Sequence, residues 1–119
     1  MKQKKEDKLT ELSMQLSVDV LKLVEELQEK KEKIISNQIG RSATSICANI
    51  AESKYAHSRA DFIAKLEIAL KEASETSKWL EMLVRANYIS QERCKPLSAT
   101  CSTIRILLIS SIKTLKSKS

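Results

Sequence analysis

A chain of 119 residues is long enough to bury a hydrophobic core and short enough to form one domain, so residues 1–119 are taken as a single domain. One glycine and one proline exclude a sheet with tight hairpin turns, and 3% aromatic residues exclude an extensive base-stacking surface. Lysine and arginine number 21 against 15 aspartate and glutamate, and the resulting charge of +6 favours an anionic partner, nucleic acid before a membrane surface.

The chain shows no sign of membrane insertion or of disulfide bonding. No stretch is long and apolar enough to span a bilayer, and the start, MKQKKEDK, leads into an amphipathic pattern rather than a signal peptide. We therefore expect a cytoplasmic protein without membrane contact. Cys47, Cys94 and Cys101 lack CxxC spacing, and two of them fall on faces predicted to be buried, which favours reduced thiols in a core over a metal site or a disulfide.

The first predicted helix reaches about residue 30. Its apolar residues recur every three or four positions along one face, namely Leu9, Leu12, Leu16, Val20, Leu23 and Leu27. The polar run QEKKEK follows without glycine or proline, so one long helix is an alternative. The next apolar stripe consists of Ile35, Ile39, Ala43, Ile46 and Ile50. At about 100° per residue this stripe is rotated by roughly 110° from the first, which predicts a break at residues 30–33.

Serines mark the starts of the third and fourth predicted helices. Ser58 followed by Asp61 resembles a capping box, and Ser90 is a good N-cap, so further breaks are predicted near residues 55–58 and 87–90. The residues predicted to be buried are Phe62, Leu66, Ala69, Ala73, Leu80 and Val84 in the third helix and Leu97, Cys101, Ile104, Leu108 and Leu115 in the fourth. Pro96 predicts an irregular or kinked start of the fourth helix.

Short connections between long helices predict antiparallel neighbours. The expected fold class is therefore all-α, an antiparallel up-down-up-down four-helix bundle. The basic ends, residues 1–7 and 116–119, are expected to fray.

The stretch RSATSICANIAES, residues 41–53, carries polar residues beside its apolar stripe. On a helical wheel Asn49 lies about 60° from the middle of that stripe, with Ser45 in the same sector and Arg41 and Glu52 farther round. Such an edge faces the seam with a neighbouring helix, where a buried polar group without a partner costs about 1–3 kcal/mol. These four residues are therefore predicted to form a structural polar strip that fixes the register between helices or between subunits.

The third helix has a second, partly apolar face opposite its core stripe. The face consists of Ala64, Ile68, Glu72, Glu75, Trp79 and Met82. In a monomer it would contact water, and it carries the only tryptophan, so we predict a homo-oligomer that uses it as the interface. The alternative is a set of isolated apolar surface residues, which are ordinary.

One end of the predicted bundle is basic. The N-terminus, the 55–58 turn and the C-terminus meet there, and the predicted nucleic-acid-binding residues are Lys4, Lys5, Lys8, Lys54, Arg59, Lys113 and Lys116. In a ring of copies these ends would form a broad positive surface suited to phosphate contacts. Solvated, frayed tails are the alternative.

Catalytic, metal and cofactor sites are not predicted. His57 is the only histidine and lies in a short turn without a partner for nucleophilic catalysis. Glu67, Glu72 and Glu75 lack the histidines of a di-iron ExxH pattern, and no glycine-rich loop is available to hold a phosphate. We expect neither enzymatic activity nor a small-molecule substrate.

RSATSICANIAES together with HSRADFIAKLEIALKEASETSKWLEML resembles the bacterial four helix bundle protein family, also called the S23 or 23S rRNA intervening-sequence protein family. The likeness covers roughly residues 35–115. The family pattern falls on Arg41, Ser45, Ile46, Asn49, Ala51, Glu52, Ser58, Asp61, Phe62, Ala69, Glu72, Glu75, Trp79 and Leu80. Members commonly have glycine at the position of Cys47 and glycine or alanine at that of Ser53. Because Cys47 and Ser53 are larger, they are expected to affect the distance between helices.

The family is similar to the accessory variability determinant of diversity-generating retroelements, a basic homopentamer that binds nucleic acid and a reverse transcriptase. The resemblance implies a non-catalytic, pentameric accessory protein that contacts RNA or DNA through phosphates. A reverse transcriptase or ribosomal RNA is a further partner that it implies. A structural or protein-interaction module without nucleic acid is the alternative, and the position of the gene would separate the two.

Overall fold

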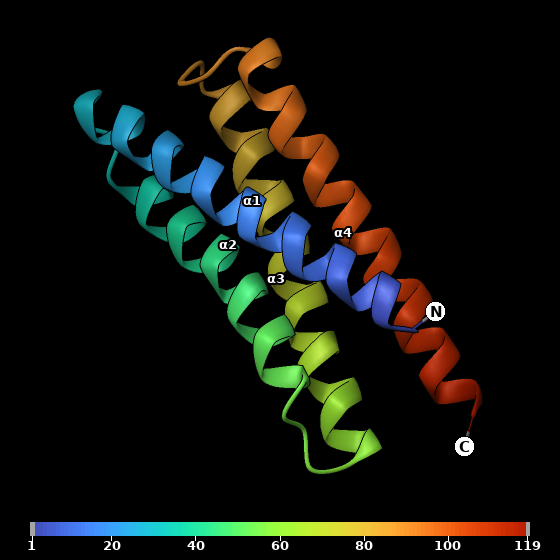
Figure 1. Ribbon diagram of the computed structural model, residues 1–119. Coiled ribbons are helices and arrows are strands. Elements are labelled where there is room, and N and C mark those ends of the chain that lie inside the picture. The colour runs from blue at the N-terminus through green and yellow to red at the C-terminus, as the bar shows by residue number, and fades with distance from the viewer. Residues whose placement is uncertain (1, 119) are drawn as a thin grey trace.

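The computed structural model describes residues 2–118, with side chains described for residues 8–118 (Figure 1). Over this range the chain forms four helices: α1 (Lys2–Glu29), α2 (Ile34–Ser53), α3 (Arg59–Arg85) and α4 (Gln91–Ser117). The three predicted breaks are therefore confirmed. Helix α1 extends to Lys2 and α4 to Ser117, and the fraying of these ends in solution stays a prediction.

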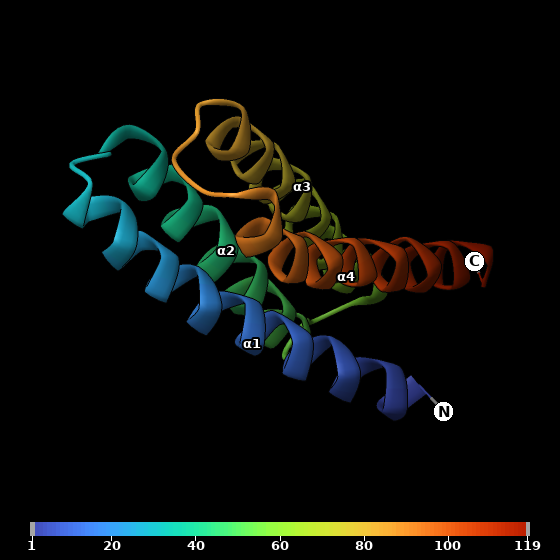
Figure 2. The same cartoon turned by 90° about the horizontal axis from the view of Figure 1, so that it is seen from above.

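The helices form the predicted antiparallel bundle, which is elongated and measures 48 × 22 × 19 Å. Each helix packs against its neighbours in sequence, and α1 also packs against α4, whereas the backbones of the diagonal pairs do not approach each other closely within the described range. The seam between α1 and α4 is the least extensive of the four. Figure 2 shows the N-terminal end of α1 set apart from the C-terminal end of α4. No described helix combines the length and the apolarity that crossing a membrane requires.

The core consists of the predicted apolar stripes with a few additions. Of the predicted residues, Leu12, Ile35, Phe62 and Val84 are half-buried and pack against the core, and the rest are buried. The pattern missed Leu83, Ile89 and Ile112 and a set of buried small polar residues, Ser13, Ser17, Ser36, Ser42, Ser53 and Thr76. These hydroxyls donate to backbone carbonyls. Ser17, for example, donates to the Ala43 carbonyl at 3.2 Å and so joins α1 to α2.

Two of the three connections contain a residue in the left-handed region. Lys31 has φ 62° and Asn87 has φ 65°, and neither is glycine. After Lys31 the amide of Glu32 donates to the Leu27 carbonyl at 2.9 Å, and an equivalent bond closes the turn at Asn87. This is the hydrogen-bond pattern of a helix C-cap in which the left-handed residue stops the helix. The turn at residues 30–33 is therefore sharp although no glycine marks it.

The carboxylate of Glu32 then starts helix α2. It accepts hydrogen bonds from the amides of Ile34 and Ile35, both at 3.1 Å, and of Ser36 at 2.8 Å. Lys33 occupies the N-cap position but makes no capping bond with its side chain. Glu32 is only 6% exposed and is the buried carboxylate that satisfies the first amides of α2.

The two predicted serine caps are present. The hydroxyl of Ser58 accepts from the Asp61 amide at 3.0 Å, and that of Ser90 accepts from the Arg93 amide at 3.0 Å. The carboxylate of Asp61 reaches one residue farther than in a standard capping box, to the amide of His57 at 3.3 Å. The α-helix is continuous from its first residue through Pro96, so the start of α4 is not irregular, and a kink at Pro96 stays a prediction.

Candidate functional site

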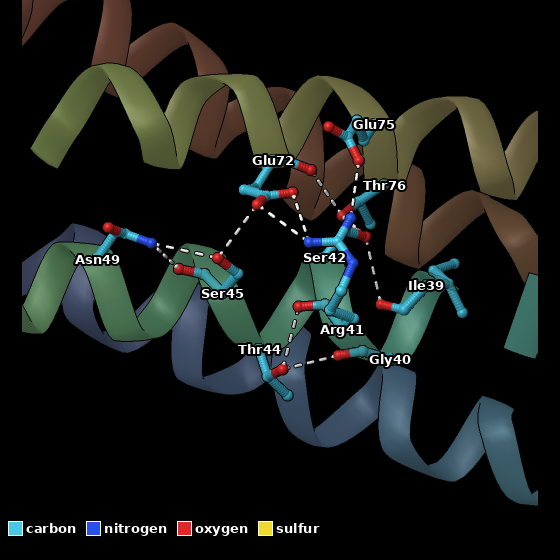
Figure 3. Close-up of polar contacts among 10 residues, drawn as sticks. All are labelled: Ile39, Gly40, Arg41, Ser42, Thr44, Ser45, Asn49, Glu72, Glu75 and Thr76. Carbon is cyan, nitrogen blue, oxygen red and sulfur yellow. Dashed lines mark hydrogen bonds and ion pairs between the residues drawn. The ribbon is translucent and has the colours of Figure 1, made fainter. Parts of the chain in front are cut away.

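A network of polar side chains joins α2 to α3 along the outer edge of the core, and we call it the polar seam (Figure 3). Its members are Arg41, Ser42, Ser45, Asn49, Glu72, Glu75 and Thr76. Three of the four residues of the predicted polar strip belong to it. The strip thus lies between two helices of one chain, in the arrangement that fixes their register.

Arg41 and Glu72 form the centre of the polar seam. The guanidinium donates to the two carboxylate oxygens of Glu72 at 3.4 and 3.2 Å and to Glu75 at 2.9 Å. The Glu72 side chain is only 12% exposed, so its charge needs this partner. The hydrogen bond from Arg41 to Glu72 and the charge of Glu72, followed by those of Glu75, raise the pKa of Arg41 above its ordinary value. Both carboxylates thus pair with the same guanidinium, which is itself half exposed.

Smaller side chains extend the seam in both directions. Ser45 donates to Glu72 at 3.3 Å, and the Asn49 amide donates to the Ser45 carbonyl at 2.9 Å and to its hydroxyl at 3.2 Å (Figure 3). Below them, Ser42 and Thr76 share a hydrogen bond of 2.7 Å with no exposed surface. Sequence reasoning missed Thr76, although its spacing of four residues from Glu72 places it on the same edge of α3.

Glu52, the fourth residue of the predicted strip, lies outside the polar seam. It is exposed and forms an ion pair of 3.1 Å with Lys65 near the end of α2. An ion pair this exposed contributes little to stability, about 0–1 kcal/mol. The role of the strip therefore rests on Arg41, Ser45 and Asn49 more than on Glu52.

The residues of the predicted interface on α3 fall into two groups, one that contacts the rest of the bundle and one that is exposed. Glu72 and Glu75 belong to the polar seam, and Trp79 is half-buried against the core, with its indole nitrogen buried and without a hydrogen-bond partner among the described residues. Ala64, Ile68 and Met82 are exposed, Ile68 at 41% and Met82 at 48%. A shallow hollow beside Trp79 is lined by Lys71, Ser74, Glu75, Lys78 and Met82. The interface role of this set stays a prediction.

The predicted basic residues gather at the end of the bundle where α1 begins, α2 turns into α3, and α4 finishes (Figure 1). Lys8, Lys54 and Lys113 are exposed there. Lys4 and Lys5 lie outside the residues whose side chains the structure describes. We call the side chains of Lys8, Lys54, Arg59, Lys113 and Lys116 the basic end.

Two residues of the basic end also contact other parts of the bundle. Arg59, at the start of α3, donates to the Lys118 carbonyl at 2.9 Å. Lys116 forms an ion pair of 2.9 Å with Glu67. These contacts tie the end of α4 to α3, so substitutions of Arg59 or Lys116 change structure as well as charge. Lys8 and Lys54 are therefore the better probes of ligand binding.

Over residues 8–118 no cluster of three or more histidine, cysteine, aspartate or glutamate residues could hold a metal ion. His57 is exposed and uses its backbone amide in the Ser58 turn. The arrangement of side chains instead combines a bundle fixed by internal polar contacts with an exposed positive end.

Comparison with known proteins extends the likeness seen in the sequence. The model of the family described as 23S rRNA-intervening sequence protein matches residues 5–110. A solved structure from Bacteroides thetaiotaomicron, a protein with unknown function from the S23 ribosomal protein family, is 47% identical with a TM-score of 0.89. That likeness covers 92% of this chain and 98% of the other. No curated protein matches. With a family match that includes all of α2 and α3 and most of α1 and α4, the chain belongs to the 23S rRNA-intervening sequence protein family.

Proposed function

We propose that this protein is a non-catalytic accessory protein that associates with itself and binds nucleic acid, RNA foremost, through the basic end. The observation that carries the proposal is the gathering of exposed lysines from α1, α2 and α4 at one end of a chain with a net charge of +6. The family description, which names an intervening sequence of ribosomal RNA, supports RNA as the first ligand to test.

Contacts to phosphates explain such binding better than recognition of bases. Lysine ammonium groups on flexible side chains neutralise phosphates without reading sequence. Two tyrosines, one phenylalanine and one tryptophan leave few rings for stacking, and Trp79 is half-buried against the core. The expected binding is therefore sensitive to salt and nearly independent of sequence.

A salt titration of fluorescence anisotropy with structured RNA and with duplex DNA tests the proposal. Counterion release predicts that log K falls by about 0.7–0.9 per unit of log salt for each phosphate neutralised. The variant Lys8→Glu with Lys54→Glu should weaken binding to all sequences and flatten the slope by up to about two such increments. Neither side chain contributes to the ion pairs described for the bundle.

The matched control places the same change of charge at the opposite end. Lys31→Glu with Lys33→Glu lowers the net charge equally, and both side chains are exposed in the turn between α1 and α2. The proposal requires this control to lose less affinity than the Lys8 and Lys54 variant. Equal losses would show attraction by net charge alone. A wild-type affinity at low salt no tighter than that of an unrelated protein of equal charge would favour the protein-interaction module.

A further inference from the structure

Helices α1 and α4, like α3, expose apolar side chains on faces that point away from the core. On α1 these are Met14, Val18 and Leu21, exposed at 54%, 44% and 51%. On α4 they are Ile106 and Ile109, exposed at 67% and 46%. The spacings of three and four residues align each group along its helix. We call these groups the α1 face and the α4 face.

The two faces carry opposite charges. Glu11 and Glu29 lie at the two ends of the α1 face, and Lys95 and Lys113 lie at the two ends of the α4 face. All four side chains are exposed, and none forms an ion pair with another residue between 8 and 118. Glu25, also exposed, adds a further negative charge to the α1 face. The exposed Lys22 lies beside these carboxylates and offsets one of them, so the face stays negative overall. Among the side chains that the structure describes, the four charges at the ends of the faces have no ion-pair partner inside the bundle.

The spacing of the charges matches between the faces. The two glutamates are eighteen residues apart, and so are the two lysines. Eighteen residues make about five helical turns and span roughly 27 Å, so each pair of charges points in one direction. The distance between the negative groups therefore equals that between the positive groups.

An antiparallel alignment of the two faces also brings their apolar residues together. With Glu11 opposite Lys113, Met14 and Val18 lie at the levels of Ile109 and Ile106. A parallel alignment also pairs the charges, but it sets Val18 against Ser102 and leaves the apolar groups out of register. Only the antiparallel alignment therefore pairs the opposite charges and also brings the apolar side chains of the two faces together.

We propose that the α1 face of one copy binds the α4 face of a second copy in this antiparallel alignment. The inference rests on the proposed self-association but not on nucleic-acid binding. The two faces lie on different helices, so the contact is heterologous and each bound copy still presents one free face. Copies therefore add until a ring closes. Because α1 and α4 are antiparallel within one bundle, the contact keeps the bundles parallel and places every basic end on the same side of the ring. Lys113 then pairs with Glu11 of a neighbouring copy, so the phosphate contacts of the ring fall to the other side chains of the basic end.

Multi-angle light scattering of single variants tests the surface. Val18→Asp blocks the α1 face and Ile106→Asp blocks the α4 face, and each variant alone is expected to run as a monomer of 13.4 kDa. Each still keeps one intact face. An equal mixture should therefore form a species of two chains that grows no further. Circular dichroism establishes that both variants keep the helical content of the wild type.

The matched control is Ile68→Asp on α3, which puts the same charge on a face of similar exposure, 41% against 44% for Val18. It should keep the mass of the wild type. Dissociation of this variant would place the interface on α3, as the sequence alone suggested, and would overturn the inference. So would wild-type mass in either blocked variant, or a mixture that stays monomeric. A wild type that is already monomeric at tens of micromolar would instead remove the proposed self-association itself.

Discussion

Replacing Glu32 by alanine measures how much the buried carboxylate between α1 and α2 stabilises the bundle. The side chain accepts three backbone amides of α2 at 3.1, 3.1 and 2.8 Å. Losing a side-chain N-cap costs about 0.5–2 kcal/mol, and losing a negative charge at a helix N-terminus costs about 0.3–1 kcal/mol. The amide of Ser36 is left without its partner in a residue that is 1% exposed. We expect Glu32→Ala to lower the free energy of unfolding by about 2–3 kcal/mol.

Urea unfolding followed by circular dichroism, at one protein concentration throughout, measures the loss. Glu32→Gln keeps the size and one acceptor oxygen but loses the charge, so about 1 kcal/mol is expected. Lys33→Ala is the control, since Lys33 is exposed at the N-cap position and makes no capping bond, and it should change stability by less than about 0.5 kcal/mol. A Glu32→Ala protein within that margin of the wild type would refute the account of how α2 begins.

Three further predictions concern single side chains. Lys31→Gly should stabilise the fold by about 1 kcal/mol and raise the thermal midpoint, because φ 62° is unfavourable for a side chain with Cβ. The hydrogen bond from Arg93 holds the pKa of Glu26 below its ordinary value of 4.5. The stabilisation from this pair is therefore complete above that value and is lost as pH falls through the lower, folded-state pKa. In acid titrations of stability, the difference between wild type and Glu26→Gln should accordingly shrink below pH 4.5. Burial raises the pKa of the Cys101 thiol to about 11, so pulsed alkylation with mass spectrometry should modify the half-buried Cys47 well before Cys101.

The helices and the core follow from local pattern because burial of apolar surface acts on every helix in the same way. The stripe through Leu16 and the stripe through Ile46 are each continuous but out of phase, and a straight helix could not bury both. The break between them was therefore predictable without glycine or proline. Ser58 and Ser90 were predictable as caps because a hydroxyl three residues before an amide is a local arrangement.

The polar seam was only half predictable, because a helical wheel does not say where the neighbouring helix lies. Glu72 and Trp79 lie about 80–100° from the middle of the α3 core stripe, and such positions are exposed or covered according to the tilt of α2. The sequence alone placed both on an outer face, whereas Arg41 draws Glu72 into the seam. The role of Glu32 was hidden for a similar reason, since it depends on the left-handed turn at Lys31.

Assembly and nucleic-acid binding are coupled in the arrangement proposed for this protein. One copy presents a handful of lysines at its basic end, and contacts this few, screened by salt, give weak binding. In a ring of parallel bundles, the basic ends of all copies lie on one side. A single strand of RNA therefore meets several copies at once, and the later contacts form within one complex. Val18 lies about 15 Å along α1 from Lys8 and is not part of the basic end. By this argument Val18→Asp nevertheless lowers both the affinity and the salt slope, because it removes the neighbouring copies. Lys8→Glu with Lys54→Glu lowers the same two quantities while the mass stays that of the assembled protein. Light scattering and salt titration of the two variants therefore separate the surface that joins the copies from the surface that binds the ligand.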